Sequence, residues 1–435
     1  MNQAKMKLNK IIGKSELTKN IITLTTGTVL AQLIPILMQP VLKRIFTPED
    51  FGVFDIYLKF LGIICVVYSL KYEIGIVIPK KKVIAIYLTI VAVVSSLVFT
   101  AVFLILAILF GDDIAEFIGI GKNKLFIMYI LPVSALFYSL FNTFNYFLIR
   151  EKKFRQSSLN KISRRGAEGI VQVFFTFLGQ FKSYGLIIGD FVGNFVYAVS
   201  AYLQNFKWQK IDARIFNKQA IRKYFIEYQQ IPKYNVIPEL LNSIFGATLT
   251  FLIISKFSIR ETGFMELAQR MLIIPSAFIS VSIGQVLLQR ITELVHQKKS
   301  ILGECKKTVS VLLVIGVAFF LVIFFFSPFI YTILFGAEWI KSAYYSQILI
   351  LYFTVSFIFS PFGQVLIALK KFKINALWQI GKLLVISVLF LKNSGSIQEY
   401  LHLYNIISTS TYIIYGIIIF MAIKNYEEQR IKTNL

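Results

Sequence analysis

Three observations in the sequence predict an all-α polytopic membrane protein made of two similar halves. Hydrophobic residues make up 56% of the 435 residues and aromatic residues 15%, which is more apolar surface than a soluble domain can shield from water. Segments such as 83–111 and 342–369 contain no Asp, Glu, Lys or Arg, and about 20 apolar residues suffice for a helix to cross a bilayer. One charge pattern also occurs twice. The predicted fold is therefore twelve transmembrane helices in two parallel six-helix lobes around a central cavity.

The apolar segments place the twelve helices along the chain. They lack the period of two that barrel strands require, so helices are expected. Their approximate ranges are 20–42, 51–70, 83–110, 125–149, 158–180, 184–204, 235–255, 264–289, 308–328, 342–369, 374–391 and 400–423. Most lysines and arginines then fall in loops on one side, which marks the cytoplasmic side and places both termini there. Topology thus explains the formal charge of +24, and no nucleic-acid partner is expected.

The lobes follow from the order of the helices, because no hydrophilic segment is long enough to fold separately. We expect an N-terminal six-helix lobe over 1–204, a cytoplasmic linker over 205–234 and a C-terminal six-helix lobe over 235–435. An even number of helices per lobe gives both lobes the same orientation in the membrane. Repeats of this kind are parallel, and they are related by an axis along the membrane normal.

The linker has a helical pattern around 217–229. This pattern fits a peripheral amphipathic helix that turns Phe216, Ile221, Phe225 and Tyr228 towards lipid. It fits a plain connection between the lobes equally well. Both interpretations stay open at the level of sequence.

The charge pattern that occurs twice lies near the start of the second helix of each lobe. Asp55 and Lys59 recur as Glu266 and Arg270, 211 positions later. In each copy an acid precedes a cation by four residues, so both side chains point from one face of a helix. Charges are costly inside a bilayer. A repeated cost suggests a repeated function.

Further matches between the halves occur in the same order. The Lys-Lys-Phe-Arg sequence at 152–155 recurs as Lys-Lys-Phe-Lys, 218 positions later. The Leu-Phe-Gly sequence that ends at Gly111 recurs loosely with Gly336, each at the expected outer end of the third helix of a lobe. The offset of 218 places Arg164 opposite Lys382, both early in the fifth helix of their lobe.

Four cations are the candidate substrate-binding residues: Lys59, Arg164, Arg270 and Lys382. Counted at 1.5 Å per residue, Lys59 and Arg270 lie roughly 10 Å below the outer surface. On the same basis, Arg164 and Lys382 lie roughly 14 Å from the inner surface. A cavity lined by these side chains would attract an anionic head group, most strongly where its walls exclude water.

Each of these cations also has a purely structural interpretation. Asp55 and Glu266, one helical turn away, can neutralise two of them as ion pairs. Arg164 can instead extend to the inner surface along with Arg165. At the outer mouth, Lys43 is expected to be an ordinary interfacial anchor.

Carboxylates in or near the spans are the candidate supporting or coupling groups. They are Asp55, Glu168, Glu239 and Glu266, and Asp190 is a further acid of this kind. A buried carboxylate can carry a coupling proton or bind a sodium ion. It can also be the partner of a nearby arginine, and pairing is the preferred interpretation.

The sequence offers hinge candidates but none of the motifs of soluble enzymes. Pro35 and Pro40 in the first helix are the preferred hinge candidates, because proline frees a carbonyl and kinks a helix. No glycine-rich phosphate loop with a following Lys-Ser or Lys-Thr occurs, so no ATPase is expected. His296 and His402 lie in different lobes without carboxylate or cysteine clusters, so no metal site is expected. We expect no catalytic residue, no cofactor and no enzymatic activity.

Several segments resemble one family, the Wzx-type polysaccharide and oligosaccharide flippases of the multidrug/oligosaccharidyl-lipid/polysaccharide (MOP) exporter superfamily. The most specific segment is Thr-Pro-Glu-Asp-Phe-Gly at 47–52, within the matching range 39–52. The other segments match mainly by their order along the chain, and together they cover essentially all of it. They lie at 78–80, 152–155, 263–270, 275, 284–286, 289–290, 334–336 and 338–339.

The resemblance implies a MATE-like exporter fold and a substrate. The substrate would be an oligosaccharide repeat unit linked by pyrophosphate to undecaprenol. It would be flipped across the bacterial cytoplasmic (inner) membrane by alternating access, for O-antigen lipopolysaccharide, capsule or exopolysaccharide assembly. Besides this lipid-linked oligosaccharide, the implied partners are membrane lipids, a coupling ion (H⁺ or Na⁺) and a polysaccharide polymerase.

Two alternatives remain at the level of sequence. A cation-coupled multidrug antiporter of the same superfamily commonly moves cationic substrates, so its cavity should be net acidic rather than net basic. A membrane enzyme of polysaccharide assembly, such as a polymerase or acyltransferase, would need a sizeable outer loop or clustered intramembrane catalytic groups. The short loops and the intramembrane cations favour the flippase over both.

Overall fold

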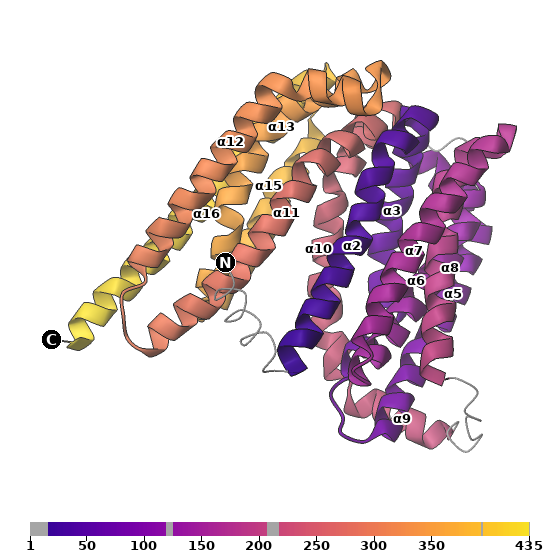
Figure 1. Cartoon of the computed structure of the whole chain (residues 1–435), viewed down its shortest axis with the longest axis horizontal. Helices are drawn as coiled ribbons and strands as arrows, with labels where there is room; N and C mark the ends of the chain where they lie inside the picture. The colour runs from indigo at the N-terminus through magenta and orange to yellow at the C-terminus, as the bar shows by residue number, and fades with distance from the viewer. Residues whose placement is uncertain (1–15, 119–124, 207–216, 393–394, 435) are drawn as a thin grey trace, which may run out of the picture. The chain divides into compact units, whose positions relative to one another are not determined.

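The chain folds into long helices joined by short connections (Figure 1). In the computed structural model, the described residues are 16–118, 125–206, 217–392 and 395–434. Among these residues there is no strand. The chain divides into two compact units, Met1–Phe251 (unit 1) and Leu252–Leu435 (unit 2), and the division falls inside α10 (Gln230–Lys256). The lobe boundaries expected at 204 and 235 stay a prediction.

The helices of each unit follow the order of the chain. Those of unit 1 before α10 are α2 (Glu16–Ile45), α3 (Pro48–Tyr68), α4 (Tyr72–Gly75), α5 (Lys82–Ile118), α6 (Phe126–Arg150), α7 (Phe154–Phe174), η2 (Phe175–Phe177), η3 (Gly179–Tyr184), α8 (Gly185–Phe206) and α9 (Lys218–Glu227). Those of unit 2 after α10 are α11 (Ile259–His296), α12 (Leu302–Phe335), η5 (Ala337–Trp339), α13 (Ile340–Phe359), η6 (Ser360–Phe362), α14 (Gly363–Ala368), α15 (Phe372–Ser387), η7 (Val388–Leu391) and α16 (Ile397–Asn434).

The helices are those of a multi-pass membrane protein. In the described part of the chain, nine helical segments are long and apolar enough to cross a membrane: α3, α5, α6, α8, α10, α12, the α13–α14 segment, the α15–η7 segment and α16. Each of the twelve predicted ranges overlaps a described helix. The helices α2, α7 and α11 are long but fall outside the apolar set. The predicted all-α membrane fold is thus confirmed, while the number of twelve spans stays a prediction.

The start of α3 explains the most specific segment of the sequence. Thr47 is its N-cap: the Thr47 hydroxyl accepts a hydrogen bond from the Asp50 N–H at 3.3 Å, and the Asp50 carboxylate accepts one from the Thr47 N–H at 3.0 Å. Pro48 occupies the first turn, where no intrahelical partner for an N–H is needed. In unit 2, the Ser258 hydroxyl likewise caps α11 by accepting from the Glu261 N–H at 3.2 Å. The residue types at the start of the segment 47–52 and at Ser258 are therefore explained by their roles in starting a helix.

The turn before α3 also corrects the expectation for Lys43. Its side chain is buried, and its ammonium lies 3.3 Å from the centre of the Phe51 ring. A cation over an aromatic face is attracted by the ring quadrupole. The first turn of α3 covers the end of α2, so Lys43 is a packed residue of unit 1 and not an interfacial anchor.

The repeated lysine turns have one geometry in both units. Lys152 and Lys370 have positive φ values of 55° and 57°. In each turn the next residue donates its backbone N–H to the carbonyl five residues earlier, at 2.8 Å. This is the left-handed helix ending in which the sixth N–H bonds the first carbonyl. The sequence match thus corresponds to a structural match between the helix ends.

The Leu-Phe-Gly match is only partly structural. Gly336 ends α12 with a φ of 102°, a conformation that suits glycine. Gly111 instead lies inside α5, which continues to Ile118. The expectation that both glycines end a helix is wrong for Gly111, because the residues after it continue the helix.

The expected helix in the linker forms as α9 and packs on protein. Ile221, Tyr224 and Tyr228 contact the apolar core that α4, α5 and α6 share in unit 1. The Phe225 carbonyl accepts a hydrogen bond from the Tyr72 hydroxyl at 2.8 Å. Ile221 and Tyr228 therefore face unit 1 rather than lipid. Phe216 lies outside the described residues.

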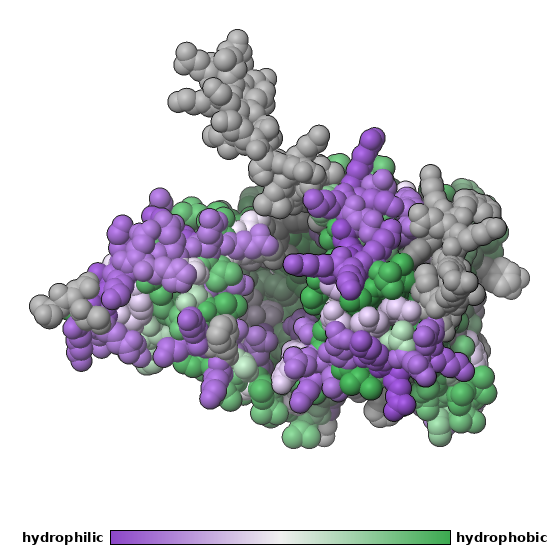
Figure 2. Space-filling view, turned by 90° about the horizontal axis from the view of Figure 1, so that it is seen from below, coloured by the Kyte–Doolittle hydropathy of each residue, from purple (hydrophilic) through white to green (hydrophobic). Residues whose placement is uncertain are grey.

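Within unit 1, hydrophilic side chains gather around α9, and within unit 2 they gather around the α11–α12 turn (Figure 2). The lysine and arginine distribution predicts that each of these two regions is cytoplasmic.

Candidate functional site

The two repeated acid–cation pairs form in both units. Asp55 Oδ1 lies 3.7 Å from Lys59 Nζ, and Glu266 Oε1 lies 2.5 Å from Arg270 Nε. The side chains of the acids are only 8% and 3% exposed, whereas those of the cations are 26% and 24% exposed. The acids are therefore buried in the fold, while each cation stays partly exposed.

Asp55 has a second partner within unit 1. The Thr250 hydroxyl of α10 donates a hydrogen bond to Asp55 Oδ2 at 2.7 Å. The carboxylate thus bonds a cation on its own helix and a hydroxyl on another. Charge-assisted hydrogen bonds of this kind are roughly twice as strong as neutral ones. Asp55 both orients Lys59 and holds α3 against α10.

The helices α7 and α8 approach closely because α8 presents glycines to α7. A Cβ on Gly193 would lie 2.9 Å from the Arg164 carbonyl oxygen, and one on Gly189 would lie 2.4 Å from Gln172 Cγ. Small residues at such positions let membrane helices pack closely. The helix α7 also packs against α2. This packing explains how α7 can bury polar groups such as Glu168.

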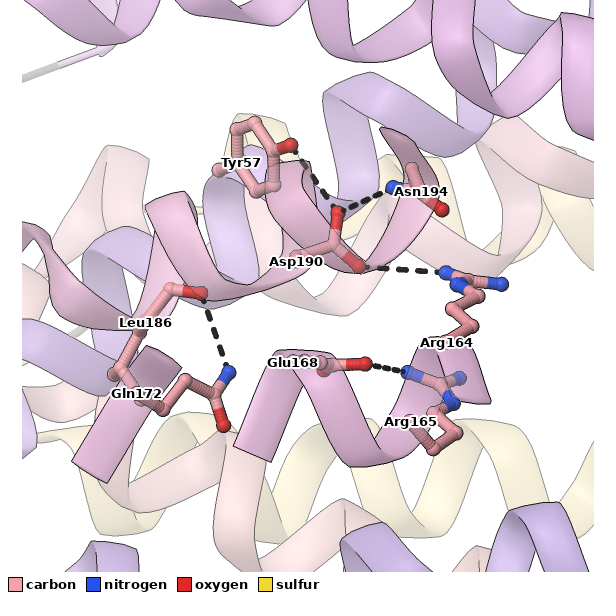
Figure 3. Close-up of polar contacts among 8 residues, drawn as sticks. All are labelled: Tyr57, Arg164, Arg165, Glu168, Gln172, Leu186, Asp190 and Asn194. Atoms are coloured by element: carbon pink, nitrogen blue, oxygen red, sulfur yellow. Dashed lines mark hydrogen bonds and ion pairs between the residues drawn. The ribbon is translucent and has the colours of Figure 1, made fainter. Parts of the chain in front are cut away.

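A buried polar network joins α3, α7 and α8 (Figure 3). Asp190 of α8 accepts hydrogen bonds from the Asn194 amide at 2.9 Å and from the Tyr57 hydroxyl at 3.2 Å. Its other oxygen lies 3.4 Å from Arg164 Nη2. The Arg164 side chain is only 13% exposed, so it does not extend to the inner surface. Asp190 is therefore paired with Arg164, in line with the preferred interpretation of this acid.

The neighbouring pair on α7 is separate from this contact. Arg165 Nη1 lies 2.6 Å from Glu168 Oε2, three residues further along the same helix (Figure 3). The Arg164 guanidinium instead lies 5.5 Å from the Tyr138 ring centre and 5.4 Å from that of Phe141. Unit 1 thus holds one arginine between a carboxylate and two aromatic rings.

We expect Gly193→Ala to destabilise this network. The added Cβ would press on the α7 backbone, and overpacking of this kind costs about 1–3 kcal/mol. Thermal unfolding of the purified protein in detergent measures the effect. The matched control is Gly166→Ala, because a Cβ on Gly166 of α7 meets nothing within 4 Å. Equal stability of the two variants would contradict close α7–α8 packing.

In unit 2, Lys382 of α15 is buried among aromatic side chains. Its ammonium donates a hydrogen bond to the Tyr412 hydroxyl at 3.2 Å. It also lies 4.8 Å from the Trp378 ring centre and 4.9 Å from that of Tyr412. Cation–π contacts strengthen where water is excluded, so these rings stabilise the charge inside unit 2.

The aromatic wall around Lys382 is itself held in place. Trp378 stacks on Tyr415 with ring centres 3.7 Å apart, and its indole N–H donates to the Thr411 carbonyl at 3.2 Å. The Tyr415 hydroxyl donates to Asn375 Oδ1 at 2.8 Å. These contacts join α15 to α16 and fix the ring faces next to the cation.

The remaining predicted residues lie elsewhere. Glu239 pairs with Lys71 at 3.6 Å, and its side chain is 52% exposed. The argument for a buried coupling acid therefore applies to Glu168 and Asp190 rather than to Glu239. Pro35 and Pro40 both lie inside the continuous helix α2, and their role as hinges stays a prediction.

Several residues of these clusters were not singled out by the sequence, among them Tyr57, Asn194, Trp378 and Tyr412. Nothing in their local sequence marks them, and 64 Tyr and Phe side chains are too many to select from. Only the packing of α3 on α8 and of α15 on α16 brings them next to the charged side chains of Asp190 and Lys382. Among the described residues, no group of three or more His, Cys, Asp and Glu side chains could hold a metal ion.

The chain is similar over nearly its whole length to solved membrane transporters. It aligns with the inward-facing structure of a multidrug resistance MATE family transporter of the MOP superfamily at 14% identity, over 94% of this chain and 99% of that one, with a TM-score of 0.72. It aligns with the lipid II flippase MurJ in an inward closed conformation at 13% identity, over 94% and 91%, with a TM-score of 0.70. It aligns with a MOP superfamily transporter from Pyrococcus furiosus at 13% identity, over 94% of this chain and 96% of that one, with a TM-score of 0.57. These likenesses show the fold.

The family is shown by a match of the sequence itself. No curated protein matches the chain. The model of the polysaccharide biosynthesis protein family matches residues 41–344, well over half of the chain. This chain therefore belongs to the polysaccharide biosynthesis protein family and has the MATE-like fold of the MOP superfamily.

Proposed function

We propose that the protein is a transporter that flips undecaprenyl-pyrophosphate-linked oligosaccharide repeat units from the cytoplasmic to the outer leaflet. The product would feed the assembly of O-antigen, capsule or exopolysaccharide. One observation carries the proposal: each unit holds two cations within its helices, Lys59 and Arg164 in unit 1 and Arg270 and Lys382 in unit 2. Membership of a polysaccharide biosynthesis family supports the same substrate class.

The chemistry of the substrate fits these cations. A sugar–pyrophosphate head cannot cross hydrocarbon unaided, because each unsatisfied polar group costs several kcal/mol. Lysine and arginine can hold a pyrophosphate by charge-assisted hydrogen bonds. The polyprenyl tail can stay in lipid while the head passes through a cationic cavity by alternating access.

The acids would tune the cations in this mechanism. Asp55 and Glu266 orient Lys59 and Arg270 through contacts within one helix. The pyrophosphate would approach the exposed part of each cation, so the acid would not have to leave. Such pre-orientation lowers the entropy cost of binding.

A transport assay with a matched arginine pair tests the proposal. Wild-type protein in vesicles should move a fluorescent polyprenyl-pyrophosphate-linked oligosaccharide between leaflets, and Arg270→Ala should abolish this movement. Arg260→Ala on the same helix is the control, because Arg260 is half exposed and pairs with Glu338 at the surface. Full transport by a folded Arg270→Ala variant would contradict the proposed role of this cation. No transport by the wild type would contradict the proposed function.

The alternative function is a cation-coupled multidrug antiporter. The observation that favours it is the pair of buried carboxylates in unit 1, Asp190 and Glu168, which can carry a proton or a sodium ion. In the flippase the same acids would serve coupling or pairing. Efflux of organic cations by the purified protein, with no lipid-linked sugar accumulating in a deletion strain, would favour the antiporter.

A further inference from the structure

A groove runs between α11 and α12 in unit 2, outside the clusters described above. Its volume is about 340 Å³, and its walls include Ile283, Val286 and Leu287 of α11 and Val311 of α12. Both helices pack against α13, which leaves the space between them open. The groove adjoins a broad exposed apolar surface on α12. Its walls therefore suit a hydrocarbon chain.

One end of the groove is polar and basic. Arg290 Nε lies 3.3 Å from Glu304 Oε1, and this contact joins the two helices there. Lys307 lines the same end. It is exposed, and no ion pair between described side chains involves it. From Arg290 to Lys307 the chain carries five lysines and arginines and only two glutamates.

The length of the groove matches one leaflet of a bilayer. Its lining on α11 runs from Ser282 to Arg290, and eight residues of helix span about 12 Å. Half of a hydrocarbon core is about 15 Å. The basic end belongs to the side that is expected to be cytoplasmic. A polyprenyl chain is far longer than one leaflet, so the dimensions favour an ordinary acyl chain.

We propose that this groove binds an anionic phospholipid of the inner leaflet. The phosphate contacts Lys307, and one acyl chain lies between Val286 and Val311. Charge complementarity selects the anionic head group, because each lysine near an anionic lipid surface contributes favourably. The inference does not depend on which substrate the protein moves.

Lipid retention by the full-length protein tests the head-group contact. The protein is placed in nanodiscs of phosphatidylethanolamine with either phosphatidylglycerol or phosphatidylcholine, and retained lipid is measured by native mass spectrometry during delipidation. We expect selective retention of phosphatidylglycerol, weakened about fivefold by Lys307→Ala. Lys306→Ala is the matched control, since Lys306 is the adjacent exposed lysine and does not line the groove. Equal retention by both variants, or of both lipids, would overturn the proposal.

A second pair of variants tests the chain-binding walls. Val286→Trp fills the groove and should abolish retention of phosphatidylglycerol. Val314→Trp is the control, because Val314 is 68% exposed on α12 outside the groove and Val286 is 67% exposed. Retention by Val286→Trp equal to that of Val314→Trp would refute the site. Displacement of phosphatidylglycerol by added undecaprenyl phosphate would instead assign the groove to the carrier lipid.

Discussion

Arg164→Met is expected to abolish transport and also to reduce the amount of folded protein. The substitution removes the cation beside the buried Asp190 carboxylate. Removing one partner of a buried ion pair costs about 3–5 kcal/mol, because the other charge loses its compensation. A single variant therefore cannot separate a structural role of Arg164 from a role in binding substrate.

The double variant Arg164→Met/Asp190→Asn separates these roles. An asparagine at position 190 can still bond Tyr57 and Asn194 without leaving a buried charge, so folding should recover towards the wild-type level. Transport should stay at least tenfold slower, because a hydrogen bond to a charged group is worth about 1.5–3 kcal/mol. The measurements are thermal unfolding in detergent and transport in vesicles, with the same protein preparations.

An ion pair of unit 1 outside this network supplies the control. Lys82→Met/Glu151→Gln removes the pair of Lys82 Nζ and Glu151 Oε2, which lie 3.6 Å apart, and should leave transport close to the wild type. Recovery of transport by Arg164→Met/Asp190→Asn would mean that Arg164 only neutralises Asp190. It would then be withdrawn from the candidate substrate-binding residues.

The contacts within single helices are the part of the site that could be predicted from the sequence. The Asp55–Lys59 and Glu266–Arg270 contacts form within one helical turn, so spacing alone determines them. The caps of α3 and α11 are equally local. The separation of four residues and the match between halves were therefore sufficient evidence.

The contacts of Asp190 could not be predicted in this way. Tyr57 lies 133 residues before Asp190 in the chain, and Arg164 lies 26 residues before it. Their meeting depends on how closely α8 approaches α7, which the glycines of α8 decide. One sequence shows those glycines but not which helix faces them. The prediction that Lys43 is an interfacial anchor was wrong for a related reason, because Phe51, which covers it, belongs to the next helix.

The second large effect is expected at Lys382, where stability and transport should separate. Lys382→Met keeps the length of the side chain and its packing on Trp378 and Tyr412. Loss of the cation–π contacts costs about 2 kcal/mol or less, and relief of the buried charge acts in the opposite direction. The unfolding temperature should therefore change little, while transport of the lipid-linked oligosaccharide is lost. Lys382→Arg should retain part of the activity, because it keeps the charge but not the compact ammonium.

The control for Lys382 lies on the same helix. Lys373→Met removes an exposed lysine near the start of α15 and should leave both stability and transport unchanged. If Lys382→Met transports normally while it is folded, the buried ammonium serves only the packing of α15 on α16. If it unfolds instead, Lys382→Arg decides: partial transport by a folded arginine variant supports a binding role for the charge at this position, and no transport contradicts the expectation. A folded Lys382→Met variant that no longer transports would support the proposal that the buried ammonium binds the anionic head group of the substrate.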